Sequence, residues 1–289
     1  MTVLTTLLVT GTLFVIMFAL GLGLPGTQLG LLLHRRSLLL RVLLGTCVLV
    51  PVMAMLLLRL PLSLEISQPA RFGIALMALC PSAPLTLRKA GKTGGSSQLA
   101  AHLQVGAALA AIVSIPLMAE LFTSFYRVQG WEIHPALVAL QVGKVQILPL
   151  ACGLLLRRWR PGWATRWAGL FGRLADLLLL LLVVVVLAKA APYLFPFMGR
   201  NLLAMGFMGV MVLVSLLIGY LLAGPDPVER TTVSLVTSMR NPGLALLFAQ
   251  IHAPTMVGLK LSIVAYLLLT VVLSVPFVVW RKKATAVAD

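Results

Sequence analysis

An arginine, Arg240, stands in the middle of a long apolar stretch and is followed at once by Asn241, Pro242 and Gly243. A guanidinium at the centre of a membrane helix costs at least about 2.5 to 3.5 kcal/mol and must face a cavity or a polar partner. Its donors can bind a carboxylate through two hydrogen bonds. Pro242 removes a backbone donor and interrupts the helix. Arg240 therefore either binds an anion or satisfies carbonyl oxygens that helix breaks leave unpaired.

A second apolar stretch is interrupted by two prolines, Pro81 and Pro84, with Ser82 between them. Either interruption alone is typical of a proline kink in a membrane helix. Two broken helices together are typical of a transporter whose substrate binds near the middle of the membrane, where half-helix N-termini attract anions. We therefore predict that the breaks are made by Pro81, Pro84, Pro242 and Gly243. The predicted substrate-binding residues near them are Arg240, Asn241, Thr86, Ser82, Thr237 and Ser238.

Two further polar residues, His102 and Gln104, lie in another apolar stretch and are predicted to line the same cavity. A histidine there could carry a proton. The alternative is a buried histidine that is simply hydrogen-bonded to a carbonyl group.

The elements that must position these residues are membrane-spanning helices. Of the 289 residues, 60% are hydrophobic and 10% are charged, so lipid must cover most of the surface. A span needs roughly 20 mainly apolar residues. The candidate spans lie near residues 3–24, 38–60, 70–88, 96–122, 136–156, 174–195, 202–223, 231–251 and 257–280.

The basic residues are distributed by side of the membrane and form no nucleic-acid-binding patch, although the net charge is +16. Of the 23 Lys and Arg, 15 fall in turns on one side, six on the other and two within spans. By the positive-inside rule the N-terminus lies outside and the C-terminus in the cytoplasm. The five tryptophans fall at span ends, as expected for the membrane interface. We expect a multi-pass protein of the cell inner (plasma) membrane.

The order of the spans predicts internal symmetry. Each broken span is followed by one further span before its half of the chain ends, and the two broken spans run in opposite directions. The expected fold class is an all-α integral membrane protein of about nine transmembrane helices in two inverted repeats, residues 1–124 and 136–283. We expect residues 1–289 to form a single transporter domain.

At these positions the chain resembles the bile acid:sodium symporter superfamily. The motifs are Met17 to Leu24, Cys80-Pro81, Gly143-Lys144 with Leu148-Pro149, and Ser238 to Ala245. The resemblance implies two inverted five-helix repeats, without the first helix in some members. It also implies a core domain of spans 2, 3, 4, 7, 8 and 9 in which the two broken helices cross, a panel domain of spans 1, 5 and 6, and a substrate site between them.

The chain departs from this family where the family binds sodium. The Ser-Asn pair after the first break is Thr86-Leu87, the acidic residue of the second motif is Val236, and the glutamine before the asparagine is Arg240. The other ligand positions correspond to Thr46, Ala100 and Gln104. Hard cations need oxygen ligands, so the resemblance implies replaced sodium sites and no metal. Arg240 would put a fixed positive charge where the family holds sodium.

Other function classes lack their signatures. There is no HExxH or GxSxG motif, which argues against a hydrolase, and no soluble output module of a receptor. The three cysteines are not paired in spacing and indicate neither disulfides nor metal binding. We therefore expect no enzyme activity and no cofactor.

The expected function is alternating-access transport of a small organic anion, without sodium coupling through the usual family site. The alternatives are a sodium-coupled symporter, a proton-linked carrier using His102, or a channel. The expected partners are the organic anion and the lipid bilayer, with no nucleic acid. The oligomeric state stays open.

Overall fold

The computed structural model describes residues 3–24, 35–81, 83, 85–126 and 135–286. All regular secondary-structure elements in these ranges are helices, which are joined by turns and short extended segments. The helices of the first half are α1 (Val3–Gly23), α3 (Arg36–Leu44), η1 (Gly45–Leu49), α4 (Val50–Arg59), η2 (Pro61–Glu65), α5 (Gln68–Leu79), α6 (Leu85–Lys92) and α7 (Ser97–Tyr126). The second half contains α8 (Pro135–Val142), η3 (Gly143–Ile147), α9 (Leu148–Trp159), α10 (Pro161–Arg200), α11 (Leu202–Leu222), α12 (Pro227–Ser238), α13 (Pro242–His252) and α14 (Leu259–Ala286).

The chain is an integral membrane protein. Within the described ranges, seven continuous helical segments are long and apolar enough to cross a bilayer. Two other predicted spans consist of helix pairs, α5 with α6 and α12 with α13, which are interrupted at the predicted breaks. The predicted all-helical membrane fold and both interruptions are confirmed, while the total of nine spans stays a prediction.

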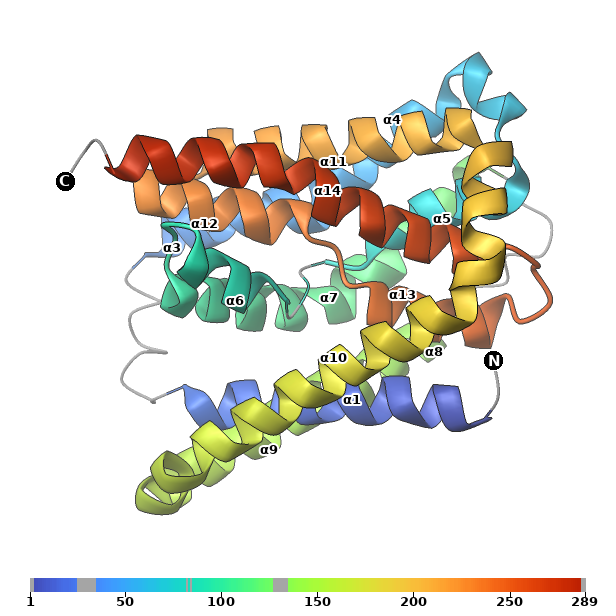
Figure 1. Ribbon diagram of the computed structural model, residues 1–289. Helices are drawn as coiled ribbons and strands as arrows, with labels where there is room; N and C mark the ends of the chain where they lie inside the picture. Colours follow the sequence, from blue (N-terminus) through green and yellow to red (C-terminus); the bar gives the residue numbers. More distant parts are fainter. Residues whose placement is uncertain (1–2, 25–34, 82, 84, 127–134, 287–289) are drawn as a thin grey trace.

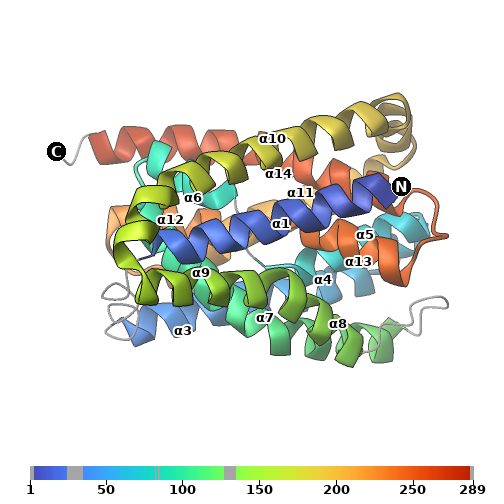
Figure 2. The same cartoon turned by 90° about the horizontal axis from the view of Figure 1, so that it is seen from below.

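The helices form two groups (Figures 1 and 2). In the first group α1 contacts α9 and α10, and we call these three helices, with α8 and η3, the panel. The second group, which we call the core, contains α3 to α7 and α11 to α14. Its main contacts join α11 with α12 and α14, and α5 with α14. The panel lies along one side of the core, and α10 runs obliquely from the end of α9 to the start of α11 (Figure 1).

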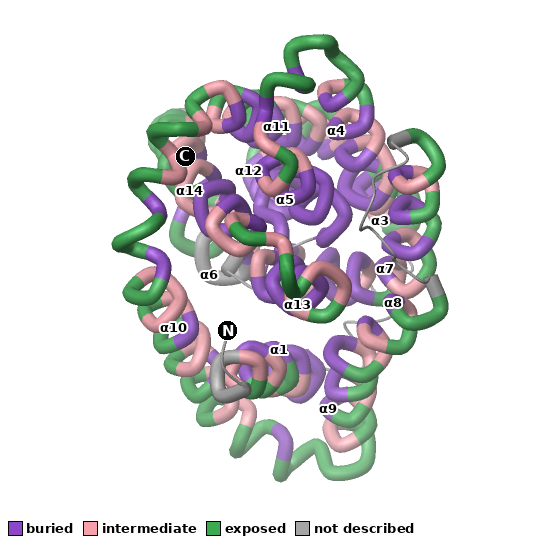
Figure 3. The backbone as a smooth tube through the Cα atoms, turned by 90° about the vertical axis from the view of Figure 1, so that its right-hand side faces the viewer, coloured by how far each residue is buried: buried purple, intermediate pink, exposed green. Residues whose placement is uncertain are grey.

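Glycines let the core helices approach closely. A methyl group added at Gly219 of α11 would come within 2.6 Å of the Cα atom of Ser234 in α12. One added at Gly73 of α5 would meet the side chain of Ser262 in α14. Such close approach provides dispersion contacts between helices where lipid removes the hydrophobic driving force. As a result α12 is buried from residue 231 to its end, which Figure 3 shows in purple.

In contrast to α12, most of the surface of α10 is exposed. Only 11% of its most apolar window is buried, against 56% in α7. Large apolar side chains on its outer face, such as Leu177 and Phe195, are more than half exposed. Lipid must therefore cover this face.

One predicted span is longer in the structure. The span expected at 174–195 is part of α10, which starts at Pro161 and continues through Pro192 and Pro196. A proline in the first turn favours helix initiation, and no glycine-rich or proline-bearing turn follows it before the apolar segment. The polar stretch after Pro161 is thus helical, and it carries Trp163 and Trp167 at the end of the span. Trp131 lies outside the described residues.

Candidate functional site

The two helix breaks cross and hydrogen-bond to one another. After α5 and α12 end, Cys80 and Met239 adopt extended backbone angles. The Ala83 N–H donates to the Met239 carbonyl oxygen at 2.9 Å, and the Asn241 N–H donates to the Cys80 carbonyl oxygen at 3.1 Å. The prolines on either side deprive the interrupted helices of donors. The crossing therefore fixes the ends of two half-helices from opposite halves of the chain against each other.

Asn241 begins the second half-helix. Its side-chain oxygen accepts a hydrogen bond from the Leu244 N–H at 3.1 Å, which makes it the N-cap of α13, and Pro242 occupies the first turn. Leu13 of the panel packs against this turn, since a methyl group at Gly243 would lie 3.1 Å from Leu13 Cδ2. The N-terminus of α13, with its positive dipole end, thus faces the panel.

Arg240 is buried beneath the crossing, with 1% of its surface exposed. Its Nε donates to the Met77 carbonyl oxygen at 3.0 Å, and Nη2 donates to the Ala78 carbonyl oxygen. Nη1 donates to the carbonyl oxygen and the hydroxyl of Thr46, at 3.0 and 2.9 Å, and approaches the Thr237 carbonyl oxygen at 3.4 Å. The guanidinium therefore lies among the carbonyl oxygens at the C-terminal ends of α5 and α12, where helix dipoles favour a cation.

The Thr46 carbonyl is available because of a local irregularity. Residues 45–49 form a π-helix, in which the Val50 N–H donates to the Gly45 carbonyl oxygen five residues earlier. The next donor in this register would be residue 51, which is proline and has no N–H. The carbonyl oxygen of Thr46 thus lacks that partner and accepts a hydrogen bond from Arg240 instead.

No carboxylate in the described part of the chain forms an ion pair with Arg240. Its electrostatic neighbours are the side chains of Tyr266, Cys47 and Cys80, and the first and last of these are fully buried. Carbonyl dipoles rather than an acid therefore compensate this positive charge.

A small cavity of about 40 Å³ lies at the crossing between the panel and the core, and Arg240 does not line it. Apolar side chains of α1, α10, α13 and α14 form most of its wall, with Ala83 and the first turn of α13 at one end. Two buried polar groups among the lining residues, Thr12 Oγ1 and Asn241 Nδ2, have no hydrogen-bond partner within the described structure. Unpaired buried polar groups are costly, and a polar part of a ligand in this cavity could supply the missing partner.

The predicted site residues do not all lie at the crossing. Thr86, Thr237 and Ser238 are buried near the breaks, and the Ser238 hydroxyl approaches the Leu235 carbonyl oxygen at 3.4 Å. Thr86 Oγ1 and Thr237 Oγ1 have no partner in the described ranges. Gln104 is buried in α7. Ser82 and Pro84 lie outside the described residues.

His102 lies elsewhere. It lines a second cavity, at the ends of α3, α7 and α12, which shares no lining residue with the cavity at the crossing. The crossing thus brings together Arg240, Asn241, Thr237 and Ser238, and it does not include His102.

Two positions that the resemblance equates with sodium ligands are apolar. Ala100 and Val236 are buried in one hydrophobic cluster with Val42 and Leu103. This packing leaves fewer oxygen atoms there for a hard cation.

Sequence reasoning missed Thr12 and Tyr266. Thr12 is one of four threonines in the first apolar span, and nothing in the sequence distinguishes it from the others. Tyr266 lies in a short apolar run between Ser262 and Thr270, which gives no signal for a buried site. The contact of Thr46 with Arg240 could also not be predicted from the sequence. The spacing from Gly45 to Pro51 does, however, indicate an irregular helix.

Comparison with known proteins identifies one related family. The model of the Sodium Bile acid symporter family matches residues 10–197, which is about two thirds of the chain and includes the first break, the panel helices and the first half of the core. A comparison with curated protein sequences finds no match.

Proposed function

Since the chain belongs to the sodium bile acid symporter family, we propose that it is a secondary transporter that carries a small organic anion by alternating access. Members of this family are membrane transporters and not enzymes. The finer points of the proposal, which are the anion, the coupling and the moving parts, rest on the geometry of the crossing.

The observation that carries the proposal is the cavity between panel and core. It lies where α1 and α10 of the panel meet the first turn of α13 in the core. Movement of one group of helices against the other would change access to this place, because its walls belong to both groups. A substrate site shared by two bodies is what alternating access requires.

The cavity favours an anion with an apolar body. The N-terminus of α13 supplies a positive dipole end, and Asn241 Nδ2 and the Thr12 hydroxyl supply donors. The remaining lining is apolar, and no charged side chain belongs to it within the described residues. A carboxylate or sulfonate could bind at the helix end while its hydrocarbon part contacts leucine and valine side chains of α10.

Arg240 supports transport without sodium coupling through the usual site. Its donors point to the carbonyl and hydroxyl oxygens of Thr46, Met77 and Ala78 and not into the cavity. Of the two roles considered for this residue, the geometry favours that of a built-in cation between two helix ends. The arginine then strengthens the positive potential at the crossing without touching the anion.

Sodium symport and proton-linked transport remain the competing functions. A sodium symporter would need ligands other than those at Ala100, Val236 and Arg240. A proton-linked carrier using His102 would have to connect that residue to a cavity it does not line.

The first test needs no known substrate. Thermal unfolding of the purified protein in detergent is compared in sodium, potassium and choline chloride at equal ionic strength. A ligand that binds only the folded state stabilises it by about 2.7 kcal/mol at a hundred times its dissociation constant. We expect equal stability in the three salts, followed by stabilisation on addition of carboxylates or sulfonates. Stabilisation by sodium alone would contradict the built-in cation and favour sodium symport.

A further inference from the structure

The larger cavity, lined in part by His102, has a volume of about 380 Å³ and lies where three core helices begin. Arg35, Ser96 and Asp226 immediately precede α3, α7 and α12, and all three residues line it. The positive-inside rule predicts that this end of the molecule faces the cytoplasm. The cavity is therefore placed at the level of lipid headgroups and is separate from the proposed transport site.

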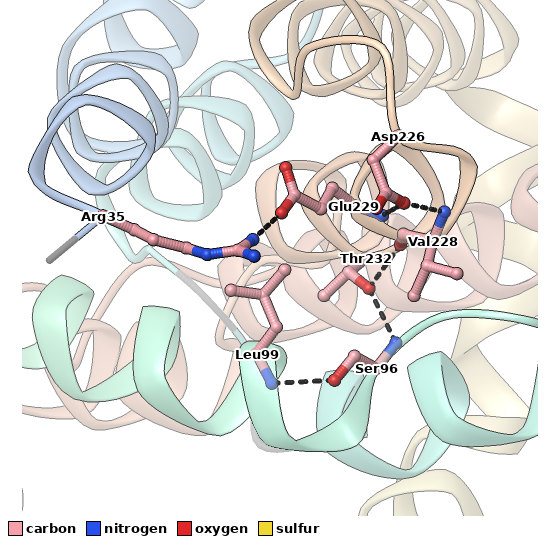
Figure 4. A network of polar contacts seen from close by, with 7 residues as sticks. All are labelled: Arg35, Ser96, Leu99, Asp226, Val228, Glu229 and Thr232. Carbon is pink, nitrogen blue, oxygen red and sulfur yellow. Dashed lines mark hydrogen bonds and ion pairs between the residues drawn. The ribbon is translucent and has the colours of Figure 1, made fainter. Parts of the chain in front are cut away.

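The rim of the cavity carries both signs of charge, as Figure 4 shows. Arg35 forms an ion pair with Glu229, and Asp226 accepts hydrogen bonds from the Val228 and Glu229 N–H groups at 2.7 and 3.1 Å. Asp226 thereby caps α12. Among the described residues no side chain caps the start of α3, so Arg35 and the positive dipole end of this helix form the positive part of the rim.

Hydrogen bonds between distant segments hold this rim in place (Figure 4). The Thr232 hydroxyl accepts from the Ser96 N–H at 2.8 Å and donates to the Val228 carbonyl oxygen at 2.7 Å. The Ser96 hydroxyl in turn accepts from the Leu99 N–H at 3.1 Å and caps α7. These bonds fix the start of α7 against α12, and the ion pair between Arg35 and Glu229 links the start of α3 to the same end of α12.

The floor of the cavity is apolar but contains one unsatisfied polar group. Leu38 and Leu103 are almost fully buried, and Leu39 and Leu99 are partly buried beside them. Among these side chains His102 is 6% exposed, and its Nε2 has no hydrogen-bond partner in the described part of the chain. A buried imidazole nitrogen without a partner is costly, and a polar group of a ligand above the leucines could supply that partner.

We propose that this cavity binds a phospholipid with a primary-ammonium headgroup. The phosphate lies against Arg35 and the uncapped start of α3, while the ammonium group lies against Glu229 and Asp226. The glycerol ester region reaches His102, and the acyl chains pass over the leucine floor. The apolar floor favours a lipid over a free headgroup, and the two acidic residues favour an ammonium group that can donate hydrogen bonds over a quaternary one.

The test is native mass spectrometry of the full chain with phosphatidylethanolamine and phosphatidylcholine of identical acyl chains. We expect the ethanolamine lipid to be retained about fivefold more strongly, the preference that one additional hydrogen bond of about 1 kcal/mol provides. Glu229→Gln should abolish that preference, and Arg35→Gln should weaken retention of both lipids. Glu120→Gln, which changes an exposed acid elsewhere on α7, is the matched control and should behave as the wild type.

A variant whose larger side chain fills the cavity distinguishes lipid binding in the cavity from lipid binding elsewhere on the surface. Leu99→Trp should block retention of the ethanolamine lipid while the thermal unfolding temperature stays within a few degrees of the wild type. Equal retention of the two lipids by the wild type, or an unchanged preference in Glu229→Gln, would overturn the proposal. Displacement of the lipid by soluble phosphoethanolamine at equal concentration would also overturn it, because the ligand would then be a free zwitterion.

Discussion

At the scale of single residues, Arg240 shows how a buried charge can be stabilised without an acid. Its partners are the carbonyl oxygens at two helix ends and the hydroxyl of Thr46. Hydrogen bonds from a charged donor contribute about 1.5 to 3 kcal/mol each. Several of them can offset the cost of burying one guanidinium. The residue therefore joins the two halves of the core in addition to carrying charge.

Removing that charge should create a cation site. In Arg240→Gln, the oxygens of Thr46, Met77 and Ala78 keep their positions around a space that lacks the guanidinium. We expect sodium to stabilise this variant against thermal unfolding, whereas the wild type shows no difference between sodium and choline. Lys144→Gln, which removes an exposed cation from the panel, serves as the control. An Arg240→Gln protein that unfolds at the same temperature in both salts would contradict the built-in cation.

Thr12 allows a test of the proposed anion contact. Its hydroxyl is buried and unpartnered within the described structure, so Thr12→Val should leave the free energy of unfolding unchanged or slightly raised. If the hydroxyl donates to the anion, the affinity for the most stabilising carboxylate should fall about tenfold. Isothermal titration measures both proteins. Thr270→Val, at a hydroxyl bonded within α14, is the control that should keep its affinity.

At the scale of the elements, the panel is built on direct backbone contact between α1 and α9. A methyl group at Gly153 would lie 2.8 Å from the Leu22 nitrogen and closer still to the Phe18 carbonyl oxygen. The same contact appears from the other side at Gly21, where an added methyl group would meet α9. The two glycines therefore set the spacing of these helices.

This contact predicts a site-specific effect of a single methyl group. Gly153→Ala should lower the free energy of unfolding by about 1 to 3 kcal/mol, because the backbones cannot approach without strain. Thermal unfolding in detergent is the measurement. Gly172→Ala in α10, where an added methyl group meets nothing within 4 Å, should not destabilise the protein. Equal losses in the two variants would show that spacing between α1 and α9 is not the cause.

The predicted breaks and the π-helices are also features of elements, and both arise from proline. Pro81 and Pro242 end helical hydrogen bonding locally, so the sequence alone predicts where the interruptions occur. Pro51 and Pro149 follow π-helical segments in the same way. The sequence could not predict that the freed carbonyl of Thr46 meets Arg240, because the two residues are 194 positions apart.

At the scale of the whole molecule, the division into panel and core is the feature that makes transport mechanically simple. The cavity at the crossing has walls from both groups, whereas the cavity at the starts of α3, α7 and α12 lies within the core alone. A movement between the groups would alter the first cavity and leave the second intact.

Distances between spin labels test this movement. With the exposed Cys152 replaced by serine, labels at Arg158 of the panel and Lys92 of the core should show a changed distance distribution when a stabilising anion is added. A pair within the core, Arg41 and Lys282, should keep one distribution. Double electron–electron resonance gives both. A shift of the core pair as large as that of the first pair would contradict motion of two bodies.

What the sequence by itself determined is whatever depends on local chemistry. Apolar length fixed the helical membrane fold, and the prolines fixed the interruptions, because lipid contact and missing N–H groups act where the residue stands. The tertiary structure decided the partners of the polar side chains. It directed Arg240 to carbonyl oxygens rather than into the cavity, placed Thr12 in the wall of the same cavity as Asn241, and set His102 in a different cavity. These outcomes depend on which distant segments pack together, and neither composition nor spacing along the chain specifies that.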